Sequence, residues 1–212
     1  MKMAKKLFLF DMDSTLINEE VIDLIAAEAG VAGEVAQITN LAMEGVLDFK
    51  ESLQRRVLLL KDLDIEFLEE VRRRITFTNG APELITAIVN NGHIPAVVSG
   101  GFTSVISPLL KEIGILNLRA NNLEIENGRL TGRVIGEVID RKAKAETLKD
   151  LAKTNQIDIS ETIAIGDGAN DIDMVKAAGL GIAFCAKRAL IEVADVSILK
   201  RDLREILKYV DL

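Results

Sequence analysis

Residues 7–16 read Leu-Phe-Leu-Phe-Asp-Met-Asp-Ser-Thr-Leu, and no other stretch constrains the fold of this chain as much. Four consecutive apolar residues are too few for a helix of their own and are typical of a strand buried on both faces. The apolar run ends abruptly at Asp11 and Asp13. Ligands of open α/β sheets bind at the carboxyl ends of the strands, so these two carboxylates lie where a ligand site is expected.

Two interpretations of Asp11 and Asp13 are open at this point. Two carboxylates this close together repel each other unless a cation lies between them, so the pair can mark a metal site. Alternatively, Asp13, Ser14 and Thr15 simply turn the chain and cap a helix. The choice between the two depends on residues far downstream.

The composition excludes several classes of protein. With 212 residues, the chain has room for one large domain or for a main domain with an insertion. A net charge of −7 argues against a broad nucleic-acid interface and against an anionic membrane surface as partner. The single Cys185 and the single His93 exclude an internal disulfide and a cysteine-based or multi-histidine metal site. No apolar run approaches the roughly 18 residues that span a membrane, and we expect a cytoplasmic protein.

The segment from Ile17 to about Thr76 has a helical character. It contains no proline, and its apolar residues recur at helical spacing rather than in strand-like alternation. The pattern predicts four short helices, the last two over residues 49–60 and 65–74 with Asp48 and Asp64 as N-caps. Because short helices are stable only when they pack against something, we expect a small bundle lying over the sheet.

From Gly80 onward, predicted helices and buried strands alternate, which indicates a parallel sheet with right-handed crossovers. A hairpin is predicted around Asn127 and Gly128, and Asp202 is expected to cap a terminal helix. The remaining predicted helices are 82–91, 103–113, 142–154, 172–178 and 187–193, and the strands are 94–98, 162–165, 180–184 and 196–199.

The polar residues that follow the buried strands should gather at one edge of this sheet. Carboxylates with no histidine or cysteine beside them suit Mg²⁺, and a serine followed by glycine N–H groups suits the oxygens of a phosphoryl group. A lysine at the start of a helix can reach the same cleft. An aspartate beside Mg²⁺ can act as a nucleophile and form an aspartyl-phosphate. The residues in question are Asp11, Asp13, Ser99, Gly100, Gly101, Lys144, Asp167, Asn170 and Asp171.

These residues, in this order, resemble the four motifs of the haloacid dehalogenase (HAD) superfamily of phosphohydrolases. The first motif corresponds to residues 11–15, the second to Ser99, the third to Lys144 and the fourth to residues 166–171. The chain is also similar, over essentially its whole length, to the phosphoserine phosphatase family of that superfamily, with Met12 where the family often has phenylalanine. The resemblance implies an α/β fold, a Rossmann-like core of residues 1–17 and 77–212 with a mainly parallel sheet, and an all-helical cap domain of residues 18–76 inserted after the first strand.

The resemblance also implies an activity. It is the Mg²⁺-dependent hydrolysis of O-phospho-L-serine to L-serine and phosphate through an aspartyl-phosphate, the last step of serine biosynthesis. Asp11 would be the nucleophile and Asp13 the general acid/base. Mg²⁺ would bind Asp11, the backbone carbonyl of Asp13, and Asp167.

The remaining roles concern the substrate. Ser99, Gly100 and Lys144 would hold the phosphoryl group, with Asn170 beside the substrate and Asp171 in support. In the cap, Glu20 would receive the substrate ammonium and Arg56 its carboxylate, with Met43 and Phe49 as the apolar lining between them. The implied partner is therefore a small molecule, and the chain is expected to act as a monomer or homodimer.

Several alternatives stay open on the sequence alone. Glu20 follows Glu19 and can be a solvated helix residue, Arg55 competes with Arg56, and Lys142 competes with Lys144. Another phosphatase or a phosphotransferase could use the same scaffold. An aspartate-phosphorylated receiver module would also need aspartates, Mg²⁺ and a lysine, but it has no use for a helical lid.

Overall fold

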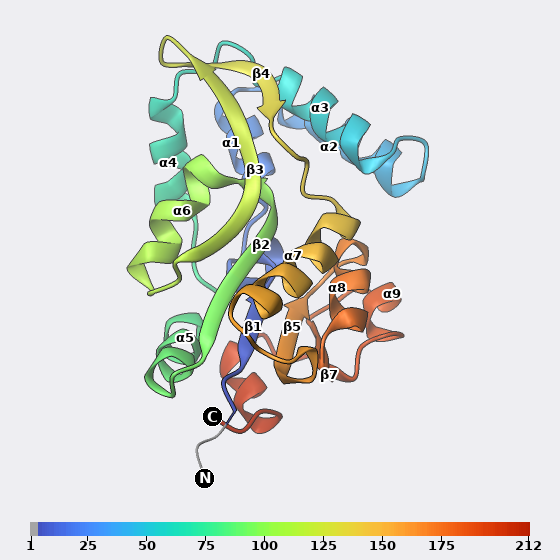
Figure 1. Ribbon diagram of the computed structural model, residues 1–212. Helices are drawn as coiled ribbons and strands as arrows, with labels where there is room; N and C mark the ends of the chain where they lie inside the picture. Colours follow the sequence, from blue (N-terminus) through green and yellow to red (C-terminus); the bar gives the residue numbers. More distant parts are fainter. Residues whose placement is uncertain (1–3) are drawn as a thin grey trace.

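A seven-stranded sheet forms the centre of the molecule, which the computed structural model describes from residue 4 to residue 212 (Figure 1). The strand order is β4-β3-β2-β1-β5-β6-β7, and all neighbours are parallel except the β3–β4 pair. This arrangement confirms the predicted α/β class with a mainly parallel sheet. The strands are β1 (Leu7–Phe10), β2 (Ile94–Phe102), β3 (Asn117–Glu126), β4 (Arg129–Ile135), β5 (Thr162–Gly166), β6 (Leu180–Phe184) and β7 (Val196–Ile198).

Strand β1 lies in the middle of the sheet, and its four side chains are fully buried, as the apolar run predicts. Leu7 and Leu9 pack on one face against α7, α8 and α9, while Phe8 and Phe10 pack on the other against α5, α6 and the final 3₁₀ helix. The molecule therefore has three layers in its core. The helices are α5 (Ala81–Asn90), α6 (Thr103–Glu112), α7 (Arg141–Thr154), α8 (Ile172–Ala177), α9 (Arg188–Ile191) and the 3₁₀ helix Leu203–Lys208.

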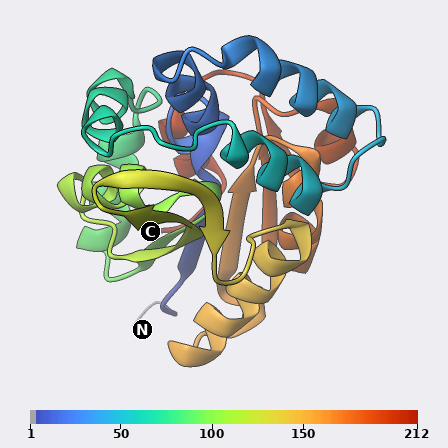
Figure 2. The same ribbon diagram turned by 90° about the horizontal axis from the view of Figure 1, so that it is seen from above.

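Four helices follow β1 and form the predicted all-helical insertion. They are α1 (Val21–Glu28), α2 (Ala32–Met43), α3 (Phe49–Leu58) and α4 (Glu66–Arg74). Asp48 caps α3 as predicted, because its carboxylate accepts a hydrogen bond from the Glu51 N–H at 2.8 Å. Asp64 accepts from the Glu66 N–H at 3.1 Å, and α4 begins one residue later than the pattern predicts. The insertion lies beyond the carboxyl end of β1 rather than on a face of the sheet (Figures 1 and 2).

The two connections to the insertion run side by side. Ile17 and Phe77 form an isolated antiparallel bridge, and the Asn18 N–H donates to the Thr76 carbonyl at 3.0 Å. The side chain of Glu19 accepts from the N–H of Thr76 at 2.9 Å. The chain thus enters and leaves the insertion at one place.

The hairpin of β3 and β4 attaches the insertion at a second place. The N–H of Asp62 donates to the Leu130 carbonyl at 2.8 Å, and the N–H of Leu130 donates to the Leu63 carbonyl at 2.9 Å. The hairpin turns at Asn127 and Gly128, both in the left-handed region, as their sequence predicts. β3 begins at Asn117, ten residues before the turn, and its first residues pair in parallel with β2.

Strand β2 extends past its predicted end at Val98. Ser99 pairs with Ala120, and pairing resumes only where Phe102 meets Asn121. The strand therefore contains an irregularity at Gly100 and Gly101, which the single-strand pattern does not reveal because it depends on the register of β3. Asp202 caps the terminal helix as expected, and this helix is a 3₁₀ helix that ends at Lys208. No helix within residues 4–212 is long and apolar enough to cross a membrane.

Close packing of α8 on β6 makes Gly181 a sensitive position. A Cβ atom at Gly181 would lie 2.5 Å from the Val175 carbonyl oxygen, whereas one at Gly33, in α2, would meet nothing within 4 Å. We expect Gly181→Ala to lower the free energy of unfolding by about 1–3 kcal/mol. The matched Gly33→Ala should leave it unchanged or raise it by up to about 1 kcal/mol. Urea denaturation followed by circular dichroism measures both, and equal effects would contradict the packing argument.

Candidate active site

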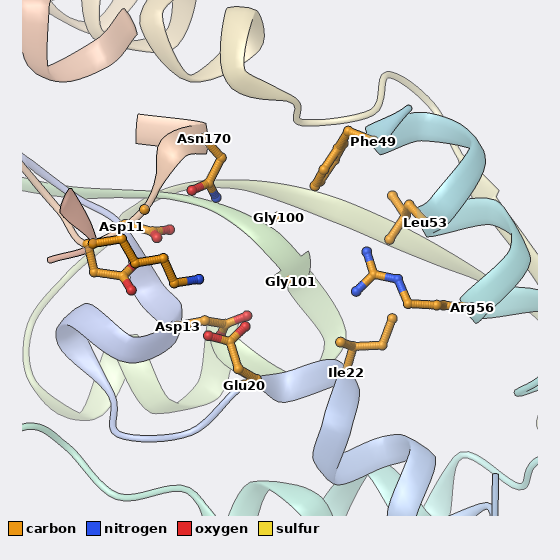
Figure 3. A pocket seen from close by; sticks show the side chains of 13 residues that line it. Asp11, Asp13, Glu20, Ile22, Phe49, Leu53, Arg56, Gly100, Gly101 and Asn170 are labelled. Carbon is orange, nitrogen blue, oxygen red and sulfur yellow. The ribbon is translucent and has the colours of Figure 1, made fainter. Parts of the chain in front are cut away.

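A cavity of about 140 Å³ lies at the carboxyl end of the sheet, between the core and the insertion (Figure 3). The sheet brings to it residues from the ends of β1, β2, β5 and β6, although these segments are far apart in the sequence. From the core it is lined by Asp11, Asp13, Gly100, Gly101, Asp167, Gly168, Asn170 and Lys187, and from the insertion by Glu20, Ile22, Phe49, Leu53 and Arg56.

Lys144 is the central cation beside this cavity. It is 1% exposed, and its Nζ donates to Oδ1 of Asp11 and to Oδ1 of Asp171, each at 2.7 Å. Burial alone would lower the pKa of Lys144, but the two carboxylates outweigh it and raise that pKa above its usual value. Asp140 caps helix α7 and thereby fixes the turn that carries Lys144. Lys142, the competing candidate, is exposed on the surface beside Glu146.

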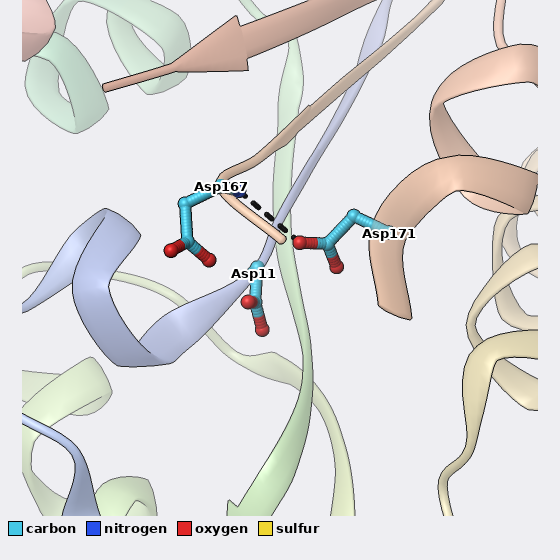
Figure 4. Close-up of side chains that lie close together, drawn as sticks. All are labelled: Asp11, Asp167 and Asp171. Atoms are coloured by element: carbon cyan, nitrogen blue, oxygen red, sulfur yellow. Dashed lines mark hydrogen bonds between the residues drawn. The ribbon is translucent and has the colours of Figure 1, made fainter. Parts of the chain in front are cut away.

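Three carboxylates meet next to Lys144. Oxygen atoms of Asp11, Asp167 and Asp171 all lie within 4.8 Å of one another (Figure 4). Both oxygens of Asp171 already have protein partners, because Oδ2 accepts from the N–H groups of Asp167 and Gly168 at 3.1 Å each and Oδ1 accepts from Lys144. The carboxylates that keep oxygens free for another ligand are therefore Asp11 and Asp167.

This donor set fits a divalent cation. Burial raises the pKa of Asp11 to about 8, with the Asp171 charge adding to the effect and Lys144 opposing it. Burial likewise raises the pKa of Asp167 to about 6. The carboxylates at and beside the cavity outnumber Lys144 and Lys187, and hard oxygen donors without histidine or cysteine suit a divalent cation.

Asp13 lies beside the cavity in a turn that reaches the insertion. Its Oδ1 atom is buried and has no hydrogen-bond partner within the described residues. Burial, and then the charges of Glu20 and Asp11, raise the pKa of Asp13 well above its usual value. Ser14 follows with a φ of +56° and donates its hydroxyl to the Glu20 carboxylate at 2.7 Å. The turn thus connects the residue pair after β1 to the first helix of the insertion.

Ser99 holds the glycine segment of β2. Its Oγ atom accepts from the Gly101 N–H at 2.8 Å, so the hydroxyl hydrogen of this fully buried side chain is left to donate elsewhere. A Cβ atom at Gly101 would lie 3.0 Å from Ser99 Oγ and 3.4 Å from the Asp13 carboxylate. Glycine at this position therefore lets the two functional side chains approach the same backbone.

On the insertion side, Arg56 lines the cavity while Arg55 does not. Arg55 forms an ion pair with Glu51 at 2.6 Å. Arg56 has no ion pair within residues 4–212, and burial lowers its pKa. Figure 3 shows its guanidinium directed into the cavity, with Glu20 on the side nearer to Asp13.

The structure brings Phe49 to the cavity but not Met43. A Cβ atom at Gly100 would lie 3.3 Å from the ring of Phe49, so the insertion touches the core at this point. Met43, which we predicted to line the same site, is the last residue of α2 and is 69% exposed. α2 buries only Val35, and Met43 lies at the opposite end of the helix, before the turn to α3.

The sequence analysis missed three cavity residues. Leu53 lies four residues after Phe49 and three before Arg56, on the same face of α3, so helical spacing could have identified it. Ile22 follows Glu20 at the start of α1. Lys187 lies beyond the end of β6, and its N–H donates to the Asp167 carbonyl at 2.8 Å. Lys187 could have been identified because it follows the carboxyl end of a predicted buried strand, as the other site residues do.

Comparison with known proteins agrees with this arrangement. Residues 8–176 match the family of haloacid dehalogenase-like hydrolases. A phosphoserine phosphatase of Methanocaldococcus jannaschii is 54% identical over 210 residues, which cover 99% of this chain and 100% of that protein. A phosphoserine phosphatase of Streptococcus thermophilus is 46% identical over 211 residues, 100% of this chain and 98% of the relative. The chain belongs to the haloacid dehalogenase-like hydrolases and, within them, to the phosphoserine phosphatase family.

Solved structures extend this similarity to three dimensions. A substrate-bound phosphoserine phosphatase complex superposes with a TM-score of 0.93 at 54% identity, covering 99% of this chain and all of the other. A phospho-aspartyl intermediate analogue of phosphoserine phosphatase gives a TM-score of 0.92 at the same identity and coverage.

The pairing of Lys144 predicts a test of stability. Lys144→Met leaves the carboxylates of Asp11 and Asp171 buried without their cation, and we expect the free energy of unfolding in metal-free buffer to fall by about 3–5 kcal/mol. The matched surface change Lys142→Met should alter it by less than about 0.5 kcal/mol. Urea denaturation measures both variants. A Lys144→Met protein as stable as the wild type would show that the pair does not hold the site together.

Proposed function

We propose that the chain is a Mg²⁺-dependent phosphatase that hydrolyses O-phospho-L-serine to L-serine and phosphate, as in the last step of serine biosynthesis. One observation carries the proposal. One small cavity has the carboxylates of Asp11 and Asp167 at the core side. At the insertion side it has one carboxylate, Glu20, and the guanidinium of Arg56, which forms no ion pair with any residue the structure describes. A phosphorylated zwitterion is complementary to both sides.

The proposed reaction has two steps with Asp11 as the nucleophile. An oxygen of its carboxylate bonds to phosphorus while the bond from phosphorus to the serine oxygen breaks, and Asp13 gives that oxygen its proton. Water then bonds to phosphorus, the Asp13 carboxylate takes the water proton, and the bond to Asp11 breaks to release phosphate. The position of Asp13 at the cavity, with an unpartnered Oδ1, supports its role as acid and base.

We propose that the metal binds the carboxylate oxygens that have no protein partner. We assign Mg²⁺ to Asp11, Asp167 and the backbone carbonyl of Asp13, with Asp171 in a supporting role because both its oxygens have other partners. When bound, the ion neutralises charge on the phosphoryl oxygens and on the carboxylates. Ser99, the Gly100 segment and Lys144 would hold the phosphoryl group, and Asn170 would lie beside it.

We assign substrate recognition to the insertion. Glu20 would receive the ammonium group and Arg56 the carboxylate, since a guanidinium forms the better fork for a carboxylate. Phe49 would cover the substrate between them, and we assign no substrate contact to Met43.

The division into a core of residues 1–17 and 77–212 and a cap of residues 18–76 is part of the proposal. Its support is the single place where the chain enters and leaves the helices, marked by the Ile17–Phe77 bridge. A cap that covers the site would exclude water during the first step and admit it for the second. The expected cytoplasmic location agrees with a substrate that is a soluble metabolite.

The substrate assignment predicts a selective effect at Glu20. Glu20→Gln keeps an acceptor for the Ser14 hydroxyl but removes the charge, so we expect kcat/KM for phosphoserine to fall about 30-fold or more. The value for 4-nitrophenyl phosphate, which has no ammonium group, should change less than about threefold. Glu19→Gln is the matched control, because Glu19 binds Thr76 and does not line the cavity. Equal losses on the two substrates would show that Glu20 does not recognise the ammonium.

A substrate panel tests the reaction itself. We expect phosphate release to be faster from phosphoserine than from phosphothreonine, phosphoethanolamine, a sugar phosphate or a nucleotide. Release should stop when EDTA removes the metal and should return when Mg²⁺ is added. Asp11→Asn should remain folded and inactive because it lacks the nucleophile. A different preferred ester would replace the substrate assignment. Activity in the presence of EDTA would show that the reaction needs no metal ion. Transfer of the phosphoryl group to an alcohol, without release of phosphate, would favour a phosphotransferase.

A further inference from the structure

The irregularity in β2 leaves backbone groups of two glycines without a partner strand, so they need hydrogen-bond partners from elsewhere. Ser99 pairs with Ala120, and the next paired residues are Phe102 and Asn121, so Gly100 and Gly101 have no partner in β3. Both glycines line the cavity. A backbone carbonyl that leaves the sheet ladder in the interior needs another hydrogen-bond donor, because an unpaired buried carbonyl is costly.

Asn121 supplies this donor from inside the protein. Its side chain is fully buried, and Nδ2 donates to the Gly100 carbonyl at 2.8 Å. Its Oδ1 accepts from the Ile139 N–H at 2.9 Å. The orientation of the amide is unambiguous, since the carbonyl of Gly100 can only accept and the N–H of Ile139 can only donate. The hydroxyl of Thr103 also donates to the backbone carbonyl of Asn121, at 3.3 Å.

The two partners of Asn121 belong to two different parts of the site. Gly100 belongs to the glycine segment, where Ser99 accepts from the Gly101 N–H. Ile139 immediately precedes Asp140, the residue that caps α7 and so fixes the turn carrying Lys144. The carboxamide of Asn121 therefore connects Gly100 to the residue before the N-cap of α7, the helix that carries Lys144.

We propose that Asn121 is a positioning residue for the phosphoryl site. By fixing the Gly100 peptide and the entrance to α7 relative to each other, it holds the glycines that line the cavity and the Lys144 ammonium in one geometry. The inference rests on the proposed function, in which these groups hold the phosphoryl group. Asn121 itself does not line the cavity, so it acts through Gly100 and Lys144 rather than on the substrate.

The chain offers a matched pair of positions for the test, because Asn121 is followed by Asn122, which is exposed on the same strand. Asn121→Asp keeps an acceptor for Ile139 but turns a carboxylate oxygen toward the Gly100 carbonyl, which repels it. We expect kcat/KM for phosphoserine to fall about 100-fold, as displacement of a positioned group does. Binding of inorganic phosphate with Mg²⁺, measured by calorimetry, should weaken about tenfold, which is about 1.4 kcal/mol. Asn122→Asp should change neither by more than twofold.

Further measurements separate positioning from loss of fold. Asn121→Ala removes the donor without burying a charge, and circular dichroism gives the folded fraction of each variant. Weaker phosphate binding by the folded protein supports the proposal. Activity that falls only with the folded fraction, while phosphate affinity stays at the wild-type value, overturns it. A wild-type protein that binds phosphate but does not hydrolyse phosphoserine would refute the proposed function and leave the phosphate-binding comparison intact.

Discussion

The ammonium of Lys144, held between the carboxylates of Asp11 and Asp171, is the interaction on which the site depends. It is a buried pair of bonds at 2.7 Å each, and it joins residues that are 133 and 27 positions apart in the chain. Removal of either side would leave buried charge without compensation. Because β1, α7 and the segment after β5 each contribute one member, the packing of these three elements and the chemistry of the site depend on each other.

The site contains more negative charge than its protein cations compensate. Burial is the largest cause that raises the pKa values of Asp11, Asp13 and Asp167. An arrangement of this kind is unfavourable in the protein alone and becomes favourable when a divalent cation binds. The surplus of negative charge at this edge of the sheet therefore lowers the stability of the metal-free protein and favours the binding of a cation.

The fold class and the cluster at the strand ends could be predicted because they depend on local patterns. Apolar runs of four or five residues identify buried strands, and a polar residue directly after such a run lies at a known edge of a parallel sheet. Spacing also identified the four helices of the insertion. The side-chain choices between Arg55 and Arg56 or Lys142 and Lys144 required the rotation of each helix against its neighbours, which the structure supplies.

Other features depend on contacts that no local pattern contains. The extension of β2 to Phe102 and the role of Asn121 both follow from the register between β2 and β3. An asparagine in a strand gives little signal of its own. Met43 was placed at the site from the resemblance, whereas in the structure it is an exposed residue at the end of α2, which buries only Val35.

The attachment of the insertion to the β3–β4 hairpin has a mechanical consequence. The two backbone attachments define a line across the base of the insertion. Here the line runs from the Ile17–Phe77 bridge to the backbone bonds at Asp62 and Leu130. Glu20 follows Ile17 by three residues and so lies near one end of this line, while the turn between α2 and α3 lies on the side of the insertion away from α4 (Figure 1). Because Glu20 lies only three residues beyond Ile17, we expect any rotation of the insertion about this line to move Glu20 less than residues far from both attachments.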